Sequence, residues 1–201
     1  MLTSESFKGD SMFQGDRTST TYYAGAKGDE IAASSHNYKL FASGAGIEIK
    51  TTSVCYYSDK RATDLTANEQ LTSAMNKSES FKGDSMAVID RTSTTYYVGA
   101  KGDEIADYSH NYKLFGTGAG TEIKTTSVFN YAQLDDVTGL ETGFAIRATA
   151  LDSAEQIQSR MLTSESFKLD SMATIDRTST THYVGAKGDE IADWSHNYKL
   201  F

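Results

Sequence analysis

The 201-residue chain lacks several features from which the function of a protein is commonly recognised. It has no proline and only one cysteine, Cys55. A single cysteine excludes an intramolecular disulfide and a zinc site built from several thiolates. No segment approaches the ~18 consecutive apolar residues of a membrane-spanning helix. The opening residues 1–7 (MLTSESF) have neither the basic start nor the apolar core of a secretory signal peptide.

An excess of basic residues is also missing. Lys and Arg number 19 against 27 Asp and Glu, so the formal net charge is −8. Proteins that bind nucleic acid carry basic stripes, and anionic membranes attract basic segments. We therefore expect no nucleic-acid partner and no membrane insertion. The acidic balance is compatible with a soluble, self-repelling surface or with cation binding.

The chain does contain one unit written three times, which is the signature of repeat architectures. Residues 4–41, 78–115 and 164–201 align without a gap, and the second and third copies differ only at Gly83/Leu169, Val88/Thr174, Tyr96/His182 and Tyr108/Trp194. We divide the chain into repeat unit 1 (1–54), a connector (55–77), repeat unit 2 (78–128), a connector (129–163) and a truncated repeat unit 3 (164–201). The opening string recurs at residues 161–167, so we expect a segment of a longer array.

Short apolar runs within each unit indicate strands. In the second copy they cover residues 86–89, 96–98, 105–106 and 112–115, separated by Gly, Asp, Ser and Asn. Such spacing is typical of short strands joined by turns. Residues 92–97 are also rich in β-branched and aromatic side chains, which favour strands.

The two connectors add one strand and two short helices to this prediction. Apolar residues alternate at Phe144, Ile146, Ala148 and Ala150, which is the period of a strand. The string SAEQ at 153–156 resembles a capping box and predicts a short helix through residue 162. The string TANE at residues 66–69 offers the same signal in the first connector.

Together these patterns predict an all-β fold that is repetitive and elongated. A β-solenoid is the first prediction, and a tandem row of small β-modules is the second. In a solenoid each rung covers the hydrophobic face of its neighbour, so an apolar content of 38% suffices. Equivalent residues such as Ile31, Ile105 and Ile191 are expected to occupy the same structural setting.

Residues 87–99 (AVIDRTSTTYYVG) and 143–150 (GFAIRATA) resemble a unit of very large repetitive bacterial surface proteins. In that family an Ala-x-Leu strand precedes an Asp-Ser turn, a Gly-Asp-Asp-like step and a Phe-Val/Ala strand. The second string is similar to the Gly-Phe-x-x-Val-x-Ala-x-Ala strand of the family. The resemblance covers about a third of each unit and implies a secreted or cell-surface array. Residues 92–95 (TSTT) replace the acidic step, so calcium is not implied at that turn.

The string KGDE, at residues 27–30, 101–104 and 187–190, places two carboxylates beside a glycine turn. Calcium prefers several oxygen ligands gathered by a sharp bend. The candidate calcium ligands are Asp29, Glu30, Asp103, Glu104, Asp189 and Glu190. Two adjacent carboxylates supply only part of a calcium shell, so a solvated turn partly balanced by lysine is the first interpretation.

No motif predicts catalysis. The string SHNY at residues 109–112 recurs in every copy, and a histidine near acidic residues is a candidate metal ligand or base. No nucleophile elbow or HExxH motif accompanies it, so we interpret His110 as a turn residue. The glycines at 116, 118 and 120 lack the spacing of a phosphate-binding loop and are also interpreted as a turn. We expect no catalytic residue and no enzyme.

Aromatic and hydroxyl side chains suggest two kinds of binding surface. Tyr96, Tyr97, Tyr108 and Trp194 are candidates for stacking on sugar rings, with avidity from three copies. Ser34 interrupts this platform in the first copy. The threonines at 92–95 and 125–126 are interpreted as outward-facing strand residues, and an ice-binding surface is the alternative.

These observations favour a structural or adhesive repeat segment of an extracellular or cell-surface bacterial protein. Its expected partners are other copies of the chain or neighbouring repeats of a longer chain, and it requires no cofactor. A carbohydrate-binding array with glycan partners is the first alternative. A calcium-stabilised or ice-binding β-solenoid is the second.

Overall fold

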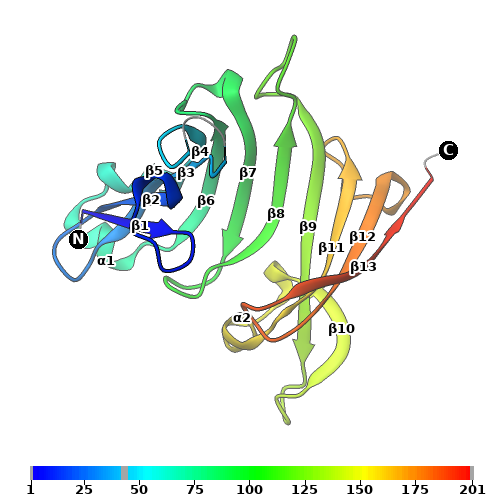
Figure 1. Cartoon of the computed structure of the whole chain (residues 1–201). Coiled ribbons are helices and arrows are strands. Elements are labelled where there is room, and N and C mark those ends of the chain that lie inside the picture. Colours follow the sequence, from blue (N-terminus) through cyan, green and yellow to red (C-terminus); the bar gives the residue numbers. More distant parts are fainter. Residues whose placement is uncertain (1, 42–44, 200–201) are drawn as a thin grey trace. The chain divides into compact units, whose positions relative to one another are not determined.

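A computed structural model describes residues 2–41 and 45–199 (Figure 1). The predicted all-β class is confirmed, since the described strands form one antiparallel sheet that is not closed into a barrel. The strands are β1 (Thr3–Phe7), β2 (Arg17–Ala24), β3 (Ile31–Tyr38), β4 (Ile49–Tyr57), β5 (Lys60–Arg61), β6 (Met75–Lys82), β7 (Arg91–Val98), β8 (Ile105–Tyr112), β9 (Ile123–Leu134), β10 (Glu141–Arg147), β11 (Met161–Lys168), β12 (Arg177–Val184) and β13 (Ile191–Asn197).

The strand order along the sheet is β1-β2-β3-β4-β6-β7-β8-β9-β11-β12-β13, with β5 on β4 and β10 on β9. Single turns of 3₁₀ helix and two short α-helices join the strands. They are η1 (Gln14–Asp16), η2 (Ala62–Asp64), α1 (Ala67–Thr72), η3 (Val88–Asp90), η4 (Ala148–Ala150), α2 (Ser153–Gln158) and η5 (Thr174–Asp176). The chain divides into two compact units, Met1–Thr94 with Lys113–Glu122, and Thr95–Tyr112 with Ile123–Phe201.

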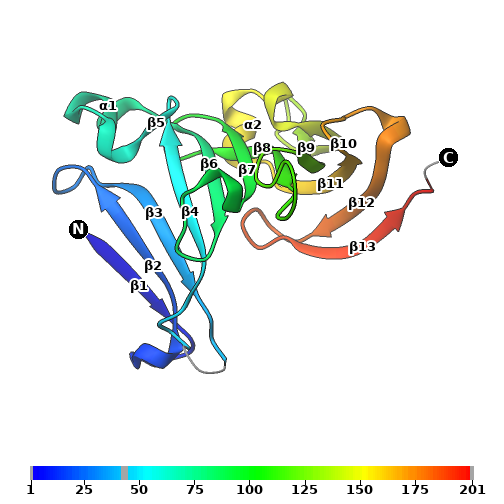
Figure 2. The ribbon, with the colours of Figure 1, turned by 90° about the horizontal axis from the view of Figure 1, so that it is seen from above.

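In the first unit, strands β1 to β4 lie side by side (Figure 2). The β2–β3 hairpin pairs Thr20 with His36 and Tyr22 with Ser34, and a register shift follows Tyr22. Gly25 begins the turn with a φ of 119°, and a Cβ there would lie 2.8 Å from the carbonyl oxygen of Asp29. Only glycine fits this close approach. The sequence GAKGDE therefore fixes the hairpin.

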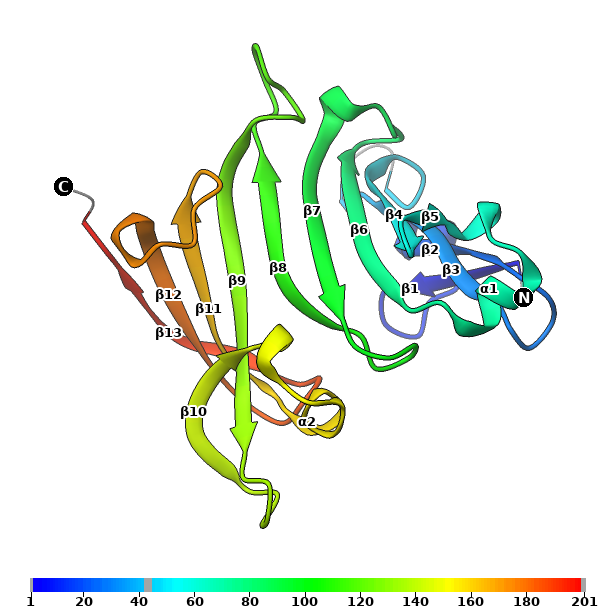
Figure 3. The ribbon, with the colours of Figure 1, turned by 180° about the vertical axis from the view of Figure 1, so that it is seen from behind.

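The second unit contains a hairpin of the same register. Strands β12 and β13 pair Thr180 with His196 and His182 with Trp194, and the shift follows His182. Strand β10 lies off the main order and pairs only with β9 among the described strands (Figure 3). The connector continues from β10 into η4 and α2.

Each unit has a small apolar core where a connector covers one sheet face. In the first unit Ile31, Tyr57, Ala62 and Leu65 are buried together. The corresponding residues of the second unit are Ile105, Tyr131, Ala148 and Leu151. Fully burying a large aliphatic side chain such as Ile31 or Leu65 is worth about 1.5–3 kcal/mol. The connectors therefore contribute core residues to the sheet, besides joining the copies.

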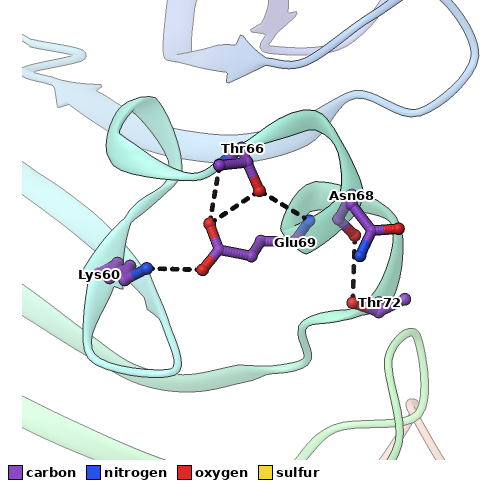
Figure 4. A network of polar contacts seen from close by, with 5 residues as sticks. All are labelled: Lys60, Thr66, Asn68, Glu69 and Thr72. Carbon is purple, nitrogen blue, oxygen red and sulfur yellow. Dashed lines mark hydrogen bonds and ion pairs between the residues drawn. The ribbon is translucent and has the colours of Figure 1, made fainter.

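The short helix of each connector begins at a capping box, as the sequence predicts. Figure 4 shows the first: Thr66 N donates to Glu69 Oε2 at 2.8 Å, and Glu69 N donates to Thr66 Oγ1 at 3.3 Å. In the second, the cap residue is Asp152 instead of the predicted Ser153, and α2 ends at Gln158 instead of residue 162. An aspartate accepts hydrogen bonds from two backbone amides here, which makes it the better cap.

Several local predictions were wrong. Residues 113–115 lie beyond the end of β8 at Tyr112, and Thr94 and Thr126, expected to face outward, are buried. Residues 86–89 form no strand, because they enter the 3₁₀ turn η3, where Val88 and Ile89 are exposed. The strand predicted through Ala150 ends at Arg147, and η4 follows. The strands β1, β6 and β11 were not predicted, since their sequence is mostly polar. The solenoid is not confirmed either: the registers described here join antiparallel neighbours, whereas a β-helix stacks parallel rungs.

Candidate functional site

Each copy of the repeat places a row of aromatic and histidine side chains on one face of a hairpin. We call this the aromatic–histidine row. Its members are Tyr22, Ser34, His36 and Tyr38 in the first copy; Tyr96, Tyr108, His110 and Tyr112 in the second; and His182, Trp194, His196 and Tyr198 in the third. The row arises because residues two apart on a strand share a face, and cross-strand pairs bring the two strands together.

In the second copy the two tyrosines stack. The ring centroids of Tyr96 and Tyr108 are 4.5 Å apart with an angle of 16° between the planes. His110 continues the row, with its ring 5.2 Å from Tyr108. Burial, followed by the negative charge of Asp107, raises the pKa of Tyr108. Tyr108 therefore stays a neutral aromatic surface at neutral pH.

An ion pair supports this stack from the connector. Arg147 Nε donates to Asp107 Oδ1 at 3.1 Å, and a second contact joins Nη2 to Oδ2. The guanidinium carbon of Arg147 lies 5.8 Å from the centroid of Tyr108. Asp107 is buried, so its carboxylate depends on this partner. In the first copy Ala33 stands at the position of Asp107, which removes the pair.

The third copy presents the most exposed row. His182 stacks on Trp194 with centroids 3.6 Å apart, and His196 lies 4.7 Å from Trp194. The exposed fraction of Trp194 is 46%. The first copy has Ser34 in this place, so Tyr22 contacts His36 directly, with ring centroids 5.2 Å apart. The common register of the β2–β3 and β12–β13 hairpins therefore carries two different surfaces.

Charged side chains border the row. Asp84 Oδ1 lies 3.6 Å from His36 Nε2, and Asp170 Oδ1 lies 3.5 Å from His110 Nε2. The carboxylates are largely exposed, so they remain available as hydrogen-bond acceptors. The guanidinium carbon of Arg17 lies 4.2 Å from the ring centroid of Tyr38. The equivalent distance in the third copy, between Arg177 and Tyr198, is 4.6 Å.

Of the aromatic residues predicted to stack on sugar rings, the structure brings some together and separates others. Tyr96 and Tyr108 are in contact, and Trp194 occupies the Tyr108 position of its own copy. Tyr97 lies outside the row, because neighbouring residues on a strand point to opposite faces. Its counterparts Tyr23 and Tyr183 use their hydroxyl groups to bond Ser4 and Ser164, each at 3.1 Å.

In each of the three KGDE turns, one of the two carboxylates, that of the glutamate, helps to close the turn. The carboxylates of Glu30, Glu104 and Glu190 each accept a hydrogen bond from the backbone amide of the glycine two residues earlier, at 2.9 Å. The backbone amides of Asp29, Asp103 and Asp189 close the turns on the alanine three residues earlier. Within residues 2–41 and 45–199 no group of three or more His, Cys, Asp or Glu side chains could hold a metal ion. Calcium binding stays a prediction.

The histidines are the site residues that the sequence interpretation placed wrongly. His110 was interpreted as a turn residue, but it lies inside β8, as His36 lies in β3 and His196 in β13. The signal was present in the sequence. Aromatic and histidine residues alternate in the order Tyr108-x-His110-x-Tyr112, which is the period of a strand.

No known protein family, curated protein or solved structure matches the chain. The helices of the described residues are all too short or too polar to cross a membrane. The aromatic–histidine row is therefore interpreted from its geometry alone.

Proposed function

We propose that the chain is a structural and adhesive repeat segment of an extracellular or cell-surface protein, arranged as a repetitive array. It works by presenting one kind of surface several times, without a catalytic site. The observation that carries this proposal is the common register of the β2–β3 and β12–β13 hairpins, which present their rows on the same framework. A framework that repeats while its surface residues change suits display.

The positions that vary between copies support the same proposal. Two of the four differences between the second and third copies are Tyr96/His182 and Tyr108/Trp194. His182 and Trp194 are direct cross-strand neighbours. The pairing of His182 with Trp194 corresponds to that of Tyr22 with Ser34 in the first copy. Half of the differences between the second and third copies thus fall on one surface pair.

A carbohydrate is the second candidate partner, favoured by the stacked rings. Flat aromatic faces bind the apolar face of a sugar ring, while nearby carboxylates accept hydrogen bonds from its hydroxyl groups. Trp194 offers such a face, and Asp84 and Asp170 lie beside their rows. Weak single contacts would add up across copies by avidity.

Adhesion of chain-coated beads, together with a glycan array, tests both proposals. Trp194→Ser and Tyr108→Ser each install the residue that the first copy already carries, so both are compatible with the hairpin. We expect each to reduce bead retention severalfold, and the double variant to reduce it by more than the product of the two, because avidity is lost.

The matched control is Val137→Ser, which changes an exposed apolar residue in a turn outside the row. Unchanged retention of the double variant would rule out the row as the adhesive surface. Retention that depends on the row, without any glycan signal, would support adhesion and contradict a carbohydrate partner.

A further inference from the structure

The strand β13 has a partner on only one side among the described residues, whereas its counterparts β3 and β8 have partners on both. These three strands have nearly the same sequence. The second partner is β4 for β3 and β9 for β8, and both partners share the sequence IKTTSV. A free strand edge is a template for pairing with another extended segment.

In β3 and β8 the second partner strand, together with the connector that follows it, covers residues whose counterparts are exposed in and beside β13. Ile31 and Ile105 are 6% and 7% exposed, but Ile191 is 66% exposed. Tyr38 is 8% exposed, and its counterpart Tyr198 is 40% exposed. Beside the edge of β13 that has no partner among the described residues, Ile191 is therefore exposed, and so is Tyr198 directly after the strand.

A buried polar atom gives a second, independent indication. Arg17 Nε donates to the carbonyl oxygen of Gly46 at 3.1 Å, and Arg91 Nε donates to that of Gly120 at 3.0 Å. These glycines lie just before β4 and β9. The equivalent atom, Arg177 Nε, is buried and has no hydrogen-bond partner in the part of the chain that the structure describes. The carbonyl oxygen that would accept from Arg177 Nε lies, in the other two copies, just before β4 or β9.

We propose that the free edge of β13 is a strand-acceptor site for an extended segment with the sequence of residues 118–131 (GAGTEIKTTSVFNY). Such a segment adds by main-chain hydrogen bonding, and its side chains set the register. The register follows from β8 and β9, in which Tyr108 pairs with Val128 and His110 with Thr126. In that register Trp194 pairs with the residue of the added segment that corresponds to Val128, and His196 pairs with the one that corresponds to Thr126.

Three side-chain contacts of the established pairs specify the segment. Asn111 Nδ2 donates to Thr125 Oγ1 at 3.3 Å, so Asn197 has a threonine partner in the added strand. The Tyr131 hydroxyl donates to the carbonyl oxygen of Ala106 at 2.7 Å. The counterpart of Ala106 in β13 is Ala192, so its carbonyl would accept from the tyrosine of the added segment.

The third contact is electrostatic. Lys113 forms an ion pair with Glu122, and Lys39 forms the same pair with Glu48. Lys199 is the corresponding lysine beside β13. The glutamate of the added segment therefore meets a positive charge at that end.

Binding of a fluorescent synthetic peptide of residues 118–131 to the intact chain tests this site. Anisotropy measures affinity, and hydrogen exchange locates the bound peptide. The control peptide carries proline at the positions of Thr125 and Thr126. Since successive residues point their amides to opposite sides of a strand, one proline removes an amide that faces β13. We expect binding with new protection of β13, and none for the proline peptide.

A pair of chain variants tests the same edge from the other side. Ile191→Asp places a charge where the peptide tyrosine packs, and we expect affinity to fall about tenfold. Val137→Asp adds the same charge at an exposed turn away from β13, and affinity should not change. Because Ile191 is exposed in the unbound chain, its substitution leaves folding intact.

Absence of peptide binding would overturn the proposal. So would equal binding of the proline peptide, protection of β1 without β13, or an Ile191→Asp variant with unchanged affinity. The site does not rest on the adhesive role, because the bead and glycan measurements depend on the aromatic–histidine row. A failure here leaves those results standing.

Discussion

Tyr56 links β4 to β6 through its hydroxyl group. The hydroxyl donates to Glu79 Oε2 at 2.9 Å, and Lys77 Nζ lies 4.3 Å from the ring centroid. Burial, followed by the hydrogen bond and the charge of Glu79, raises the pKa of Tyr56 to about 12. The folded chain thus favours the neutral phenol more strongly than the unfolded chain does.

Replacing Tyr56 by phenylalanine removes a hydrogen bond to a carboxylate, and we expect the free energy of unfolding to fall by about 1 kcal/mol. The folded pKa lies above the unfolded value of 10.0, so the stabilisation is complete below pH 10 and is lost as pH rises toward 12. Urea unfolding at pH 8 and pH 11 should give a smaller difference between the two chains at pH 11. An equal difference at both pH values would contradict the assigned shift.

Asp107 and Arg147 show how one residue changes the surface of a copy. Asp107 is buried, so removal of Arg147 alone leaves an uncompensated charge. Breaking a buried pair costs about 3–5 kcal/mol, and the partial exposure of Arg147 reduces this to about 2 kcal/mol. The first copy, with Ala33 and Arg61, shows that the same hairpin also forms without the pair.

We therefore expect Arg147→Leu to destabilise the chain more than Asp107→Ala does. Adding Asp107→Ala to Arg147→Leu should recover part of the loss, because the stranded carboxylate is gone. Thermal or urea unfolding of the two single variants and the double variant measures this coupling. Purely additive losses would show that the pair does not matter for folding.

At the scale of elements, strands were predicted where side chains carry the β signal. The string RTSTTYYV, with its threonines and tyrosines, forms β7 as expected. The string SESF gave no such signal, yet it lies in β1, β6 and β11. Its glutamates are satisfied across the sheet, since Glu79 pairs with Arg91 at 2.9 Å. A polar strand that gains its partners only through tertiary pairing cannot be recognised from its own composition.

The helix α2 depends on its cap, because six residues are too few for a stable isolated helix. Asp152 Oδ1 accepts from the amides of Ala154 and Glu155, each at 2.8 Å. We expect Asp152→Ala to lower the free energy of unfolding by about 1 kcal/mol. Ser153→Ala is the matched control and should change it little. Equal effects of the two substitutions, measured by urea unfolding, would contradict the assigned cap.

The KGDE turns offer a test of calcium at the same scale. Their glutamates already accept hydrogen bonds from backbone amides, so the turns close without a cation. We expect neither EDTA nor millimolar calcium to shift the melting temperature. A rise with calcium that Glu104→Gln abolishes would establish a calcium site, by linkage of ligand to the folded state.

At the scale of the molecule, the sequence predicted three copies and an all-β class, but not the way in which the strands pair. Short strands joined by glycine turns fit a solenoid and an antiparallel sheet equally well. The choice depends on which distant strands share a register, such as β4 with β6 through Val54 and Glu79. The aromatic–histidine row was only half predicted for the same reason, since it needs the cross-strand pairing of His182 with Trp194.

Like sequences in this chain take like registers, and β13 differs from β3 and β8 because it has one partner strand among the described residues instead of two. Hydrogen exchange along the free chain tests this central claim most directly. We expect the amides of β3 and β8 to be protected throughout, because both edges of these strands are paired. In β13 we expect every second amide to exchange much faster, since only the edge toward β12 is paired. Protection of β13 equal to that of β3 and β8 would contradict the account.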